Sequence, residues 1–147
     1  MQTDRAVMNS LLDCIPHAKV LGLRFISLGN GECCLELPVS SHIKAVQGRP
    51  VAGGAITTLL DSAMGSTAFI ATGRFTPIVT LDLRVDHLHS IAHHAPLICH
   101  AKCHHQIDDI FFVWGKVVQN QANDKKTIAT ASGTFMKTFR NLGQARG

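Results

Sequence analysis

Apolar and polar residues follow two different periods along this chain. From Gly48 to Gly73 apolar residues fall on nearly every side of a helix, which is typical of a long helix buried in a core. Before and after this stretch apolar residues alternate with polar ones, as they do in strands. We therefore expect an α+β fold in which a mainly antiparallel, six-stranded sheet wraps one long central helix.

The region before the central helix predicts a short helix and a hairpin. The helix runs from Thr3 to Ile15 and ends at Pro16. A first strand follows through alternating Leu21, Leu23 and Phe25. A tight turn at Gly29-Asn30-Gly31 then leads to a second strand, whose apolar positions are Cys33, Leu35, Leu37 and Val39.

Four more strands are predicted after the central helix. In the first of them two sets of residues alternate: Val79, Leu81, Leu83 and Val85 on one face, and Thr80, Asp82, Arg84 and Asp86 on the other. The alternation slips at His87-Leu88, which indicates a bulge or the end of the strand. The other three strands are expected around Leu97–Cys103, Ile110–Val118 and Ala129–Phe135.

Length and composition indicate one globular domain over residues 1–147. Hydrophobic residues make up 46% of the chain and charged residues 16%, which favours an oligomer with little charged surface. The formal net charge of +4 suits a small anionic ligand as well as it suits nucleic acid. Because the chain has no dense Lys/Arg run and no basic aromatic face, we expect no nucleic-acid binding.

Other classes of protein are disfavoured by single features. The five cysteines form neither an even set nor a C-x-x-C pair, and the N-terminus has no signal-peptide pattern, so we expect a cytoplasmic protein. Asp61 and several hydroxyl residues interrupt the central helix, which argues against a membrane span. His87 and His89 share a strand face, but no histidine spacing matches a metal site; we expect no metal and no cofactor.

Asp61 is the candidate acid of this sequence. An ionised carboxylate in an apolar helix is costly unless it is paired or used. At the start of the helix, Gly53 and Gly54 leave their N–H groups accessible, and the N–H groups of a first turn have no intrahelical partner. Such donors suit a developing oxyanion.

Eight residues separate Gly53 from Asp61, which corresponds to about 12 Å along a helix axis. One substrate carbonyl cannot contact both, so a catalytic role for both predicts an active site between two copies of the chain. A structural interpretation stays open. In it, Asp61 bonds to Thr57, Thr58 or backbone, and the two glycines allow close packing.

The helix that carries Gly53, Gly54 and Asp61, together with two of the later strands, resembles the corresponding parts of the PaaI-like acyl-CoA thioesterases of the hotdog fold. That family's helix begins, loosely, with His-Gly-Gly and continues to Leu-x-Asp-x-Ala. The matching segments here are Gly53–Ala55 (GGA), Leu59–Gly65 (LLDSAMG), Thr80–Val85 (TLDLRV) and Ile128–Phe135 (IATASGTF). The resemblance implies that Asp61, from the subunit opposite the bound thioester, is the catalytic nucleophile or general base. It also implies that Gly53, with Gly54 close by, donates backbone N–H to the thioester oxygen. Thr80 is the polar residue implied near the acid.

Two substrate-binding positions depart from the family pattern. Ala52 stands where many relatives have the histidine, and Gln47 takes the place of the loop Asn or Gln only with a one-residue slip. The resemblance implies hydrolysis of an acyl-CoA or similar thioester by a homodimer or a homotetramer of paired dimers. The alternative is a non-catalytic hotdog module that binds acyl thioesters or another apolar ligand.

Overall fold

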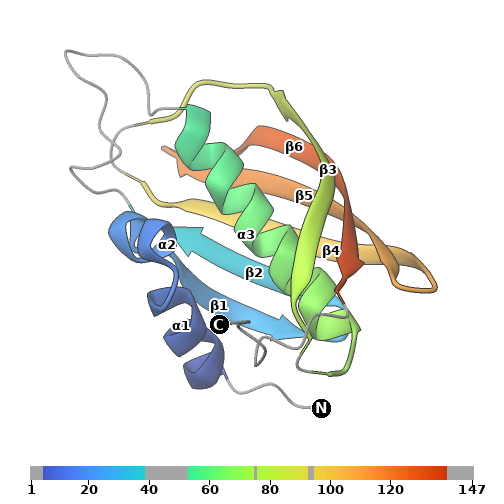
Figure 1. The fold of residues 1–147 in the computed structure, drawn as a ribbon. Helices are drawn as coiled ribbons and strands as arrows, with labels where there is room; N and C mark the ends of the chain where they lie inside the picture. The colour runs from blue at the N-terminus through green and yellow to red at the C-terminus, as the bar shows by residue number, and fades with distance from the viewer. Residues whose placement is uncertain (1–4, 39–52, 75, 93–94, 139–147) are drawn as a thin grey trace.

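The computed structural model describes residues 5–38, 53–74, 76–92 and 95–138 (Figure 1). In chain order these ranges form α1 (Arg5–Asp13), α2 (Pro16–Leu21), β1 (Arg24–Gly29), β2 (Glu32–Leu37), α3 (Gly53–Ala71), β3 (Ile78–His87), β4 (Leu97–Ile107), β5 (Ile110–Gln121) and β6 (Asp124–Lys137).

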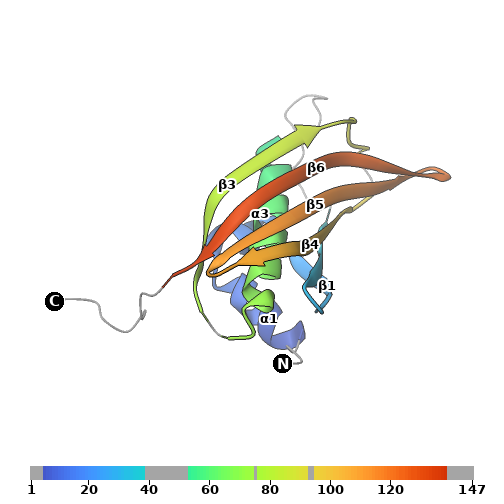
Figure 2. The same ribbon diagram turned by 90° about the vertical axis from the view of Figure 1, so that its right-hand side faces the viewer.

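The six strands form one antiparallel sheet in the order β1-β2-β4-β5-β6-β3. The sheet curves around α3, which crosses its concave face (Figures 1 and 2). The expected α+β architecture, with one long helix between the second and third strands, is confirmed. β1 and β3 are the two edges of the sheet.

Helix α3 is buried on the side that faces the sheet. Leu60 and Met64 are fully buried there, and two glycines of the sheet make room for them. A Cβ added to Gly115 would lie 2.8 Å from Met64 Sδ, and one added to Gly133 would lie 3.0 Å from Met64 Cε. The opposite side of α3 is only half buried. This side carries a polar stripe of Thr57, Thr58, Asp61, Ser62 and Ser66. The expectation of a helix buried all round is therefore wrong on this side.

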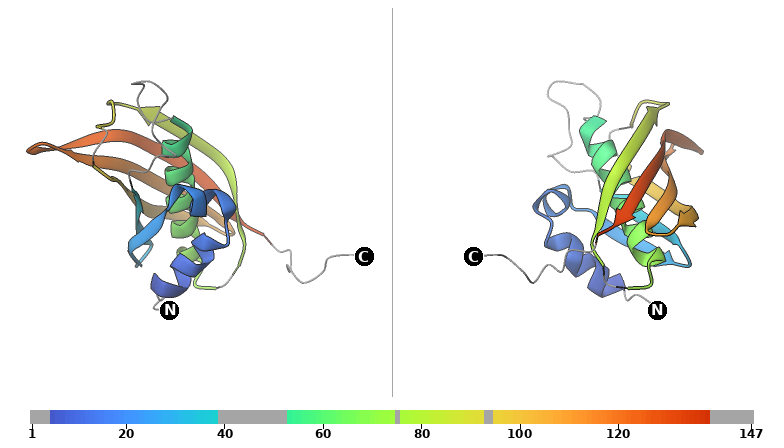
Figure 3. Two further views of the ribbon diagram at one scale, coloured as in Figure 1. Left: turned by 90° about the vertical axis from the view of Figure 1, so that its left-hand side faces the viewer. Right: turned by 45° about the vertical axis from the view of Figure 1, so that its right-hand side comes forward.

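The N-terminal region contains one more helix than expected. The predicted helix over Thr3–Ile15 is observed as α1, but Pro16 begins α2 instead of leading into the first strand. Proline suits the first turn of a helix because its fixed φ matches the helix and no N–H is needed there. Leu21 thus ends α2, and Gly22, at φ 69°, closes it with an N–H bond to Lys19 O. α1 packs against β1 and α2 against α3 (Figure 3).

The predicted hairpin is confirmed. Asn30 and Gly31 adopt φ values of 54° and 71° between β1 and β2, as the tight turn requires. The last three strands are all longer than their apolar cores predicted. The expected second-strand residue Val39 and the loop after it lie outside the described residues.

Strand β3 contains a bulge at Leu81. Thr80 pairs with Phe135 of β6 and Asp82 pairs with the preceding Thr134, so Leu81 is an extra residue. The bulge reverses the alternation, which places Thr80 on the helix side together with Leu83 and leaves Leu81 half exposed. The prediction that Thr80 and Leu83 lie on opposite faces is therefore wrong. The slip expected at His87-Leu88 is the end of the strand.

Candidate active site

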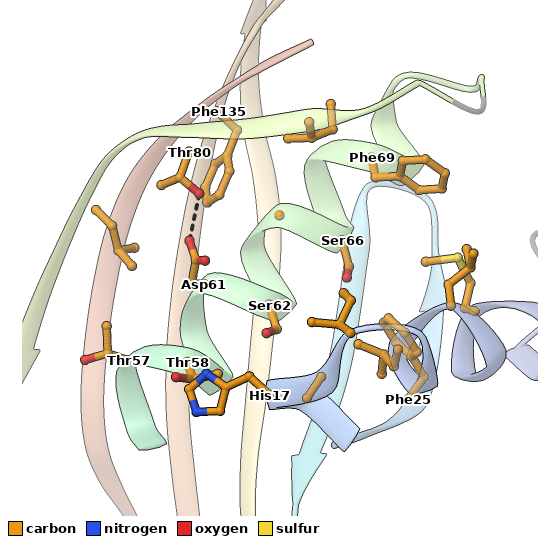
Figure 4. Close-up of a pocket in the computed structure, with 18 residues that line it drawn as sticks. His17, Phe25, Thr57, Thr58, Asp61, Ser62, Ser66, Phe69, Thr80 and Phe135 are labelled. Carbon is orange, nitrogen blue, oxygen red and sulfur yellow. Dashed lines mark hydrogen bonds between the residues drawn. The ribbon is translucent and has the colours of Figure 1, made fainter. Parts of the chain in front are cut away.

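A cavity of about 710 Å³ lies between the polar stripe of α3 and the N-terminal helices (Figure 4). The stripe forms because residues four apart stack on one face of a helix, and here they are small or polar. The rest of the cavity wall is mostly apolar. Its main side chains are Met8, Leu11, Leu12, Ile15, Phe25, Phe69, Ile78, Leu83 and Phe135. Such a space suits an apolar group attached to a polar reacting centre.

Asp61 is the only carboxylate on the wall of this cavity among the described residues. Thr80 Oγ1 donates a hydrogen bond of 2.8 Å to Asp61 Oδ1 (Figure 4). The bulge at Leu81 makes this bond possible because it turns Thr80 toward the helix. The structure therefore brings together two of the residues that the sequence singled out.

The neighbouring hydroxyl groups of α3 are engaged elsewhere. Thr57 Oγ1 donates to Gly53 O at 3.2 Å, and Thr58 Oγ1 donates to Gly54 O at 2.9 Å. Asp61 is half buried and has no other hydrogen bond among the described residues. The interpretation of Asp61 as a core acid held by Thr57 or Thr58 is therefore wrong.

Gly53 and Gly54 form the first turn of α3 and are both exposed. Among the described residues, no atom lies within 4 Å of a Cβ added to Gly54, so a ligand can approach its backbone. Both glycines belong to one end of the helix, about 12 Å along the axis from Asp61. The structure thus does not bring Gly53 and Asp61 of one chain together. The expected substrate contacts Gln47 and Ala52 lie outside the described residues.

His87 has a position that the sequence did not suggest. A Cβ added to Gly53 would lie 3.8 Å from His87 Cε1 and 3.9 Å from Nε2, so the ring edge faces the first turn of α3. The sequence had grouped this histidine with His89, whose Nδ1 instead donates to Thr127 O at 2.8 Å. Within the described ranges no three His, Cys, Asp or Glu residues lie close enough to hold a metal ion. Only the tertiary fold reveals the contact with Gly53, because 33 intervening residues separate the two positions.

The buried thiols are poor nucleophiles. Burial, helped by the neighbouring Cys34, raises the pKa of Cys33 from an ordinary value of 9.0 to about 12. Burial also raises the pKa of Cys99. Since the thiolate is the reactive form, neither of these two thiols is a good candidate for a nucleophile.

No helix in the described part of the chain combines the length and apolar character needed to cross a membrane. A family model for the thioesterase superfamily matches residues 51–123, a range that includes α3 and the strands β3, β4 and β5. No curated protein sequence matches the chain significantly.

Solved structures agree with this family match. A Pseudomonas aeruginosa protein is 31% identical, with a TM-score of 0.75 over 88% of this chain and 95% of its own. The Escherichia coli PaaI protein from the phenylacetic acid degradation operon is 21% identical, with a TM-score of 0.75 over 89% and 90% of the two chains. A Haemophilus influenzae thioesterase is 15% identical, with a TM-score of 0.81 over 100% and 97%. The last two likenesses show the fold alone.

Proposed function

Because the chain belongs to the thioesterase superfamily, we propose that it hydrolyses an acyl-CoA or a related acyl thioester to the free acid and the thiol. The observation that carries this proposal is the pair formed by Asp61 and Thr80 on the wall of an apolar cavity. The acyl group occupies the cavity, and its carbonyl lies beside the carboxylate.

The reaction needs a base and an oxyanion donor. Asp61 takes a proton from water while the water oxygen bonds to the carbonyl carbon, and the carbonyl electrons move onto its oxygen. That oxygen accepts hydrogen bonds from the N–H groups of Gly53 and Gly54. The C–S bond then breaks, and the leaving thiolate receives the proton held by Asp61. If Asp61 attacks as a nucleophile instead, its oxygen bonds to the carbonyl carbon and the C–S bond breaks, so that an acyl anhydride forms and the thiolate leaves. Water then hydrolyses the anhydride, which releases the acid, restores the Asp61 carboxylate and supplies the proton for the thiolate.

The proposal requires two copies of the chain, because Gly53 and Asp61 of one chain are about 12 Å apart along the helix axis. Strand β3 supports such an assembly. It is a free sheet edge in the described structure, and Val79 and Leu81 on it are 40% and 50% exposed. An exposed apolar edge favours pairing with a second strand. We expect a homodimer joined at β3, and a homotetramer where two dimers pair.

The test is steady-state hydrolysis of acetyl-, octanoyl-, palmitoyl- and phenylacetyl-CoA, with the free thiol detected. Asp61→Asn keeps the size of the side chain and an acceptor for Thr80 but removes the base. Asp124→Asn makes the same chemical change at an exposed position in the β5–β6 hairpin and serves as the control. Light scattering after size exclusion reports the number of subunits in each variant.

We expect Asp61→Asn to lower kcat by at least 100-fold while the control and the oligomeric state stay unchanged. Turnover that survives Asp61→Asn, or an active monomer, contradicts the proposed site. Binding of these thioesters without hydrolysis would support the alternative function, a non-catalytic binding module, in place of the enzyme.

A further inference from the structure

We infer that His87 is a further catalytic residue, which donates a hydrogen bond to the thioester carbonyl oxygen beside Gly53 and serves the site that contains Asp61 of the partner subunit. This inference rests on the proposed function. Its starting observation is that the Cε1–Nε2 edge of the imidazole faces the first turn of α3, 3.8–3.9 Å from where a Cβ on Gly53 would lie.

The ring of His87 is available to a ligand. The residue is exposed at the end of β3, and no hydrogen bond or ion pair in the described structure involves its imidazole. His89, two residues further along, has its Nδ1 committed to the Thr127 carbonyl oxygen. The two histidines therefore differ in role: His89 is held by the sheet, whereas His87 faces the glycines that we propose as oxyanion donors.

The direction of β3 places His87 and Asp61 in opposite halves of one chain. β3 runs back along α3, so that its first residues lie beside the middle of the helix and its last beside the helix start (Figures 1 and 3). Thr80 bonds to Asp61 near the start of the strand, and the ring of His87 faces Gly53 at its end. One chain thus carries the carboxylate of Asp61 near the start of β3 and the hydrogen-bond donors of His87 and Gly53 near the end of β3.

Antiparallel pairing of two β3 edges brings these ends together. A pairing centred on Arg84, in which Leu81 is again the extra residue, places His87 opposite Thr80 of the partner subunit. Directly opposed residues of an antiparallel pair point to the same side of the sheet, and both residues lie on the helix side here. The pairing that places Gly53 near the partner's Asp61 therefore places His87 near it as well.

The chemistry fits the position. An imidazole N–H next to the first-turn amides adds a third donor for the oxygen that becomes negative in the transition state. The family resemblance places a histidine immediately before the two glycines, where this chain has Ala52. His87 supplies an imidazole to the same end of the helix from a different strand.

The first part of the test compares His87→Phe, which keeps the ring but removes the donor, with His87→Gln, which keeps an N–H. His104→Gln is the control, because His104 is exposed on β4, stacks on Trp114 at a ring distance of 4.0 Å and does not line the cavity. On the best thioester of the panel we expect His87→Phe to lower kcat roughly 100-fold with little change in KM. His87→Gln recovers part of this loss, and the control equals the wild type.

The second part tests the subunit that His87 serves. Asp61→Ala and His87→Phe chains carrying different affinity tags are co-expressed, and the mixed dimer is purified through both tags. In our arrangement one of its two sites has both intact residues, so the mixed dimer regains about half of the wild-type kcat although each parent homodimer is nearly inactive.

The outcomes separate this inference from the proposed function. Full activity of a folded, dimeric His87→Phe protein overturns the inference while leaving the function of Asp61 intact. A mixed dimer as inactive as its parents overturns the assignment across subunits. A wild type that hydrolyses no thioester overturns the proposed function and the role of His87 with it.

Discussion

Substitution of Gly115 by alanine tests how tightly the helix that carries Asp61 is held on the sheet. The new Cβ would lie 2.8 Å from Met64 Sδ and 2.9 Å from Leu60 Cδ2, closer than carbon atoms approach in proteins. Both neighbours are fully buried. The helix must therefore shift, or the two side chains must leave their preferred rotamers.

Two effects of opposite sign determine how much Gly115→Ala changes the free energy of unfolding. Inserting a methyl group into a filled core costs about 1–3 kcal/mol. Replacing glycine by alanine restricts the unfolded chain, which stabilises the folded protein by about 0.4–1 kcal/mol. The overpacking is the larger effect, and we expect a net loss of about 1–2 kcal/mol, or several degrees in Tm for a chain of this size.

Urea unfolding at one fixed protomer concentration measures this loss, since the stability of a dimer depends on concentration. Gly65→Ala is the matched control within α3. Its Cβ would meet Phe135 Cε1 at 3.6 Å, an ordinary contact, and alanine favours the helix by about 1 kcal/mol. The same chemical change should therefore stabilise the protein at Gly65 and destabilise it at Gly115. Equal or greater stability of Gly115→Ala would refute the packing argument.

Three further predictions follow from single contacts. Thr80→Val keeps the side-chain shape but removes the hydrogen bond to Asp61, so kcat should fall about 10-fold in steady-state assays while Thr80→Ser stays near the wild type; equal losses in both variants contradict this. Gln119→Leu leaves the backbone groups of residues 92 and 95 without their 2.6–2.8 Å partners, at a cost of about 2–4 kcal/mol in urea unfolding; unchanged stability contradicts it. Burial raises the pKa of Cys33 to about 12, so the folded protein holds the thiol proton more tightly than the unfolded chain does. The contribution of Cys33 to the free energy of unfolding is therefore complete below pH 9.0 and declines as the pH rises toward 12. Cys33→Ala should flatten that decline, and alkylation of the native protein should reach the exposed Cys14 before Cys33, as mass spectrometry can show.

The architecture was predictable because periodicity records which faces of an element are buried. The central helix and all six strands followed from this pattern, and the Gly29–Gly31 turn followed from residues that tolerate positive φ. Helix α2 was missed because Pro16 reads equally as the end of one helix or the first residue of the next. Local sequence does not distinguish these two uses of proline.

The site was predictable where one element carries it and not where several elements meet. Asp61 stood out as the one acid of an apolar helix, and Thr80 entered through the family resemblance. The contact between them depends on an extra residue in β3, which simple alternation assigns to the wrong face. The contact of His87 with Gly53 joins a strand end to a helix start, and no periodic pattern encodes such a distance.

The bulge at Leu81 makes the site depend on the number of residues in β3 as well as on their identity. Deleting Leu81 would remove no group that touches Asp61, yet it would restore regular alternation and turn either Thr80 or Leu83 to the outer face. A gap of one residue in this strand therefore carries as much information about activity as the loss of a functional side chain. Homologues that keep Asp61 but have a shorter β3 are natural candidates for altered chemistry on the same scaffold.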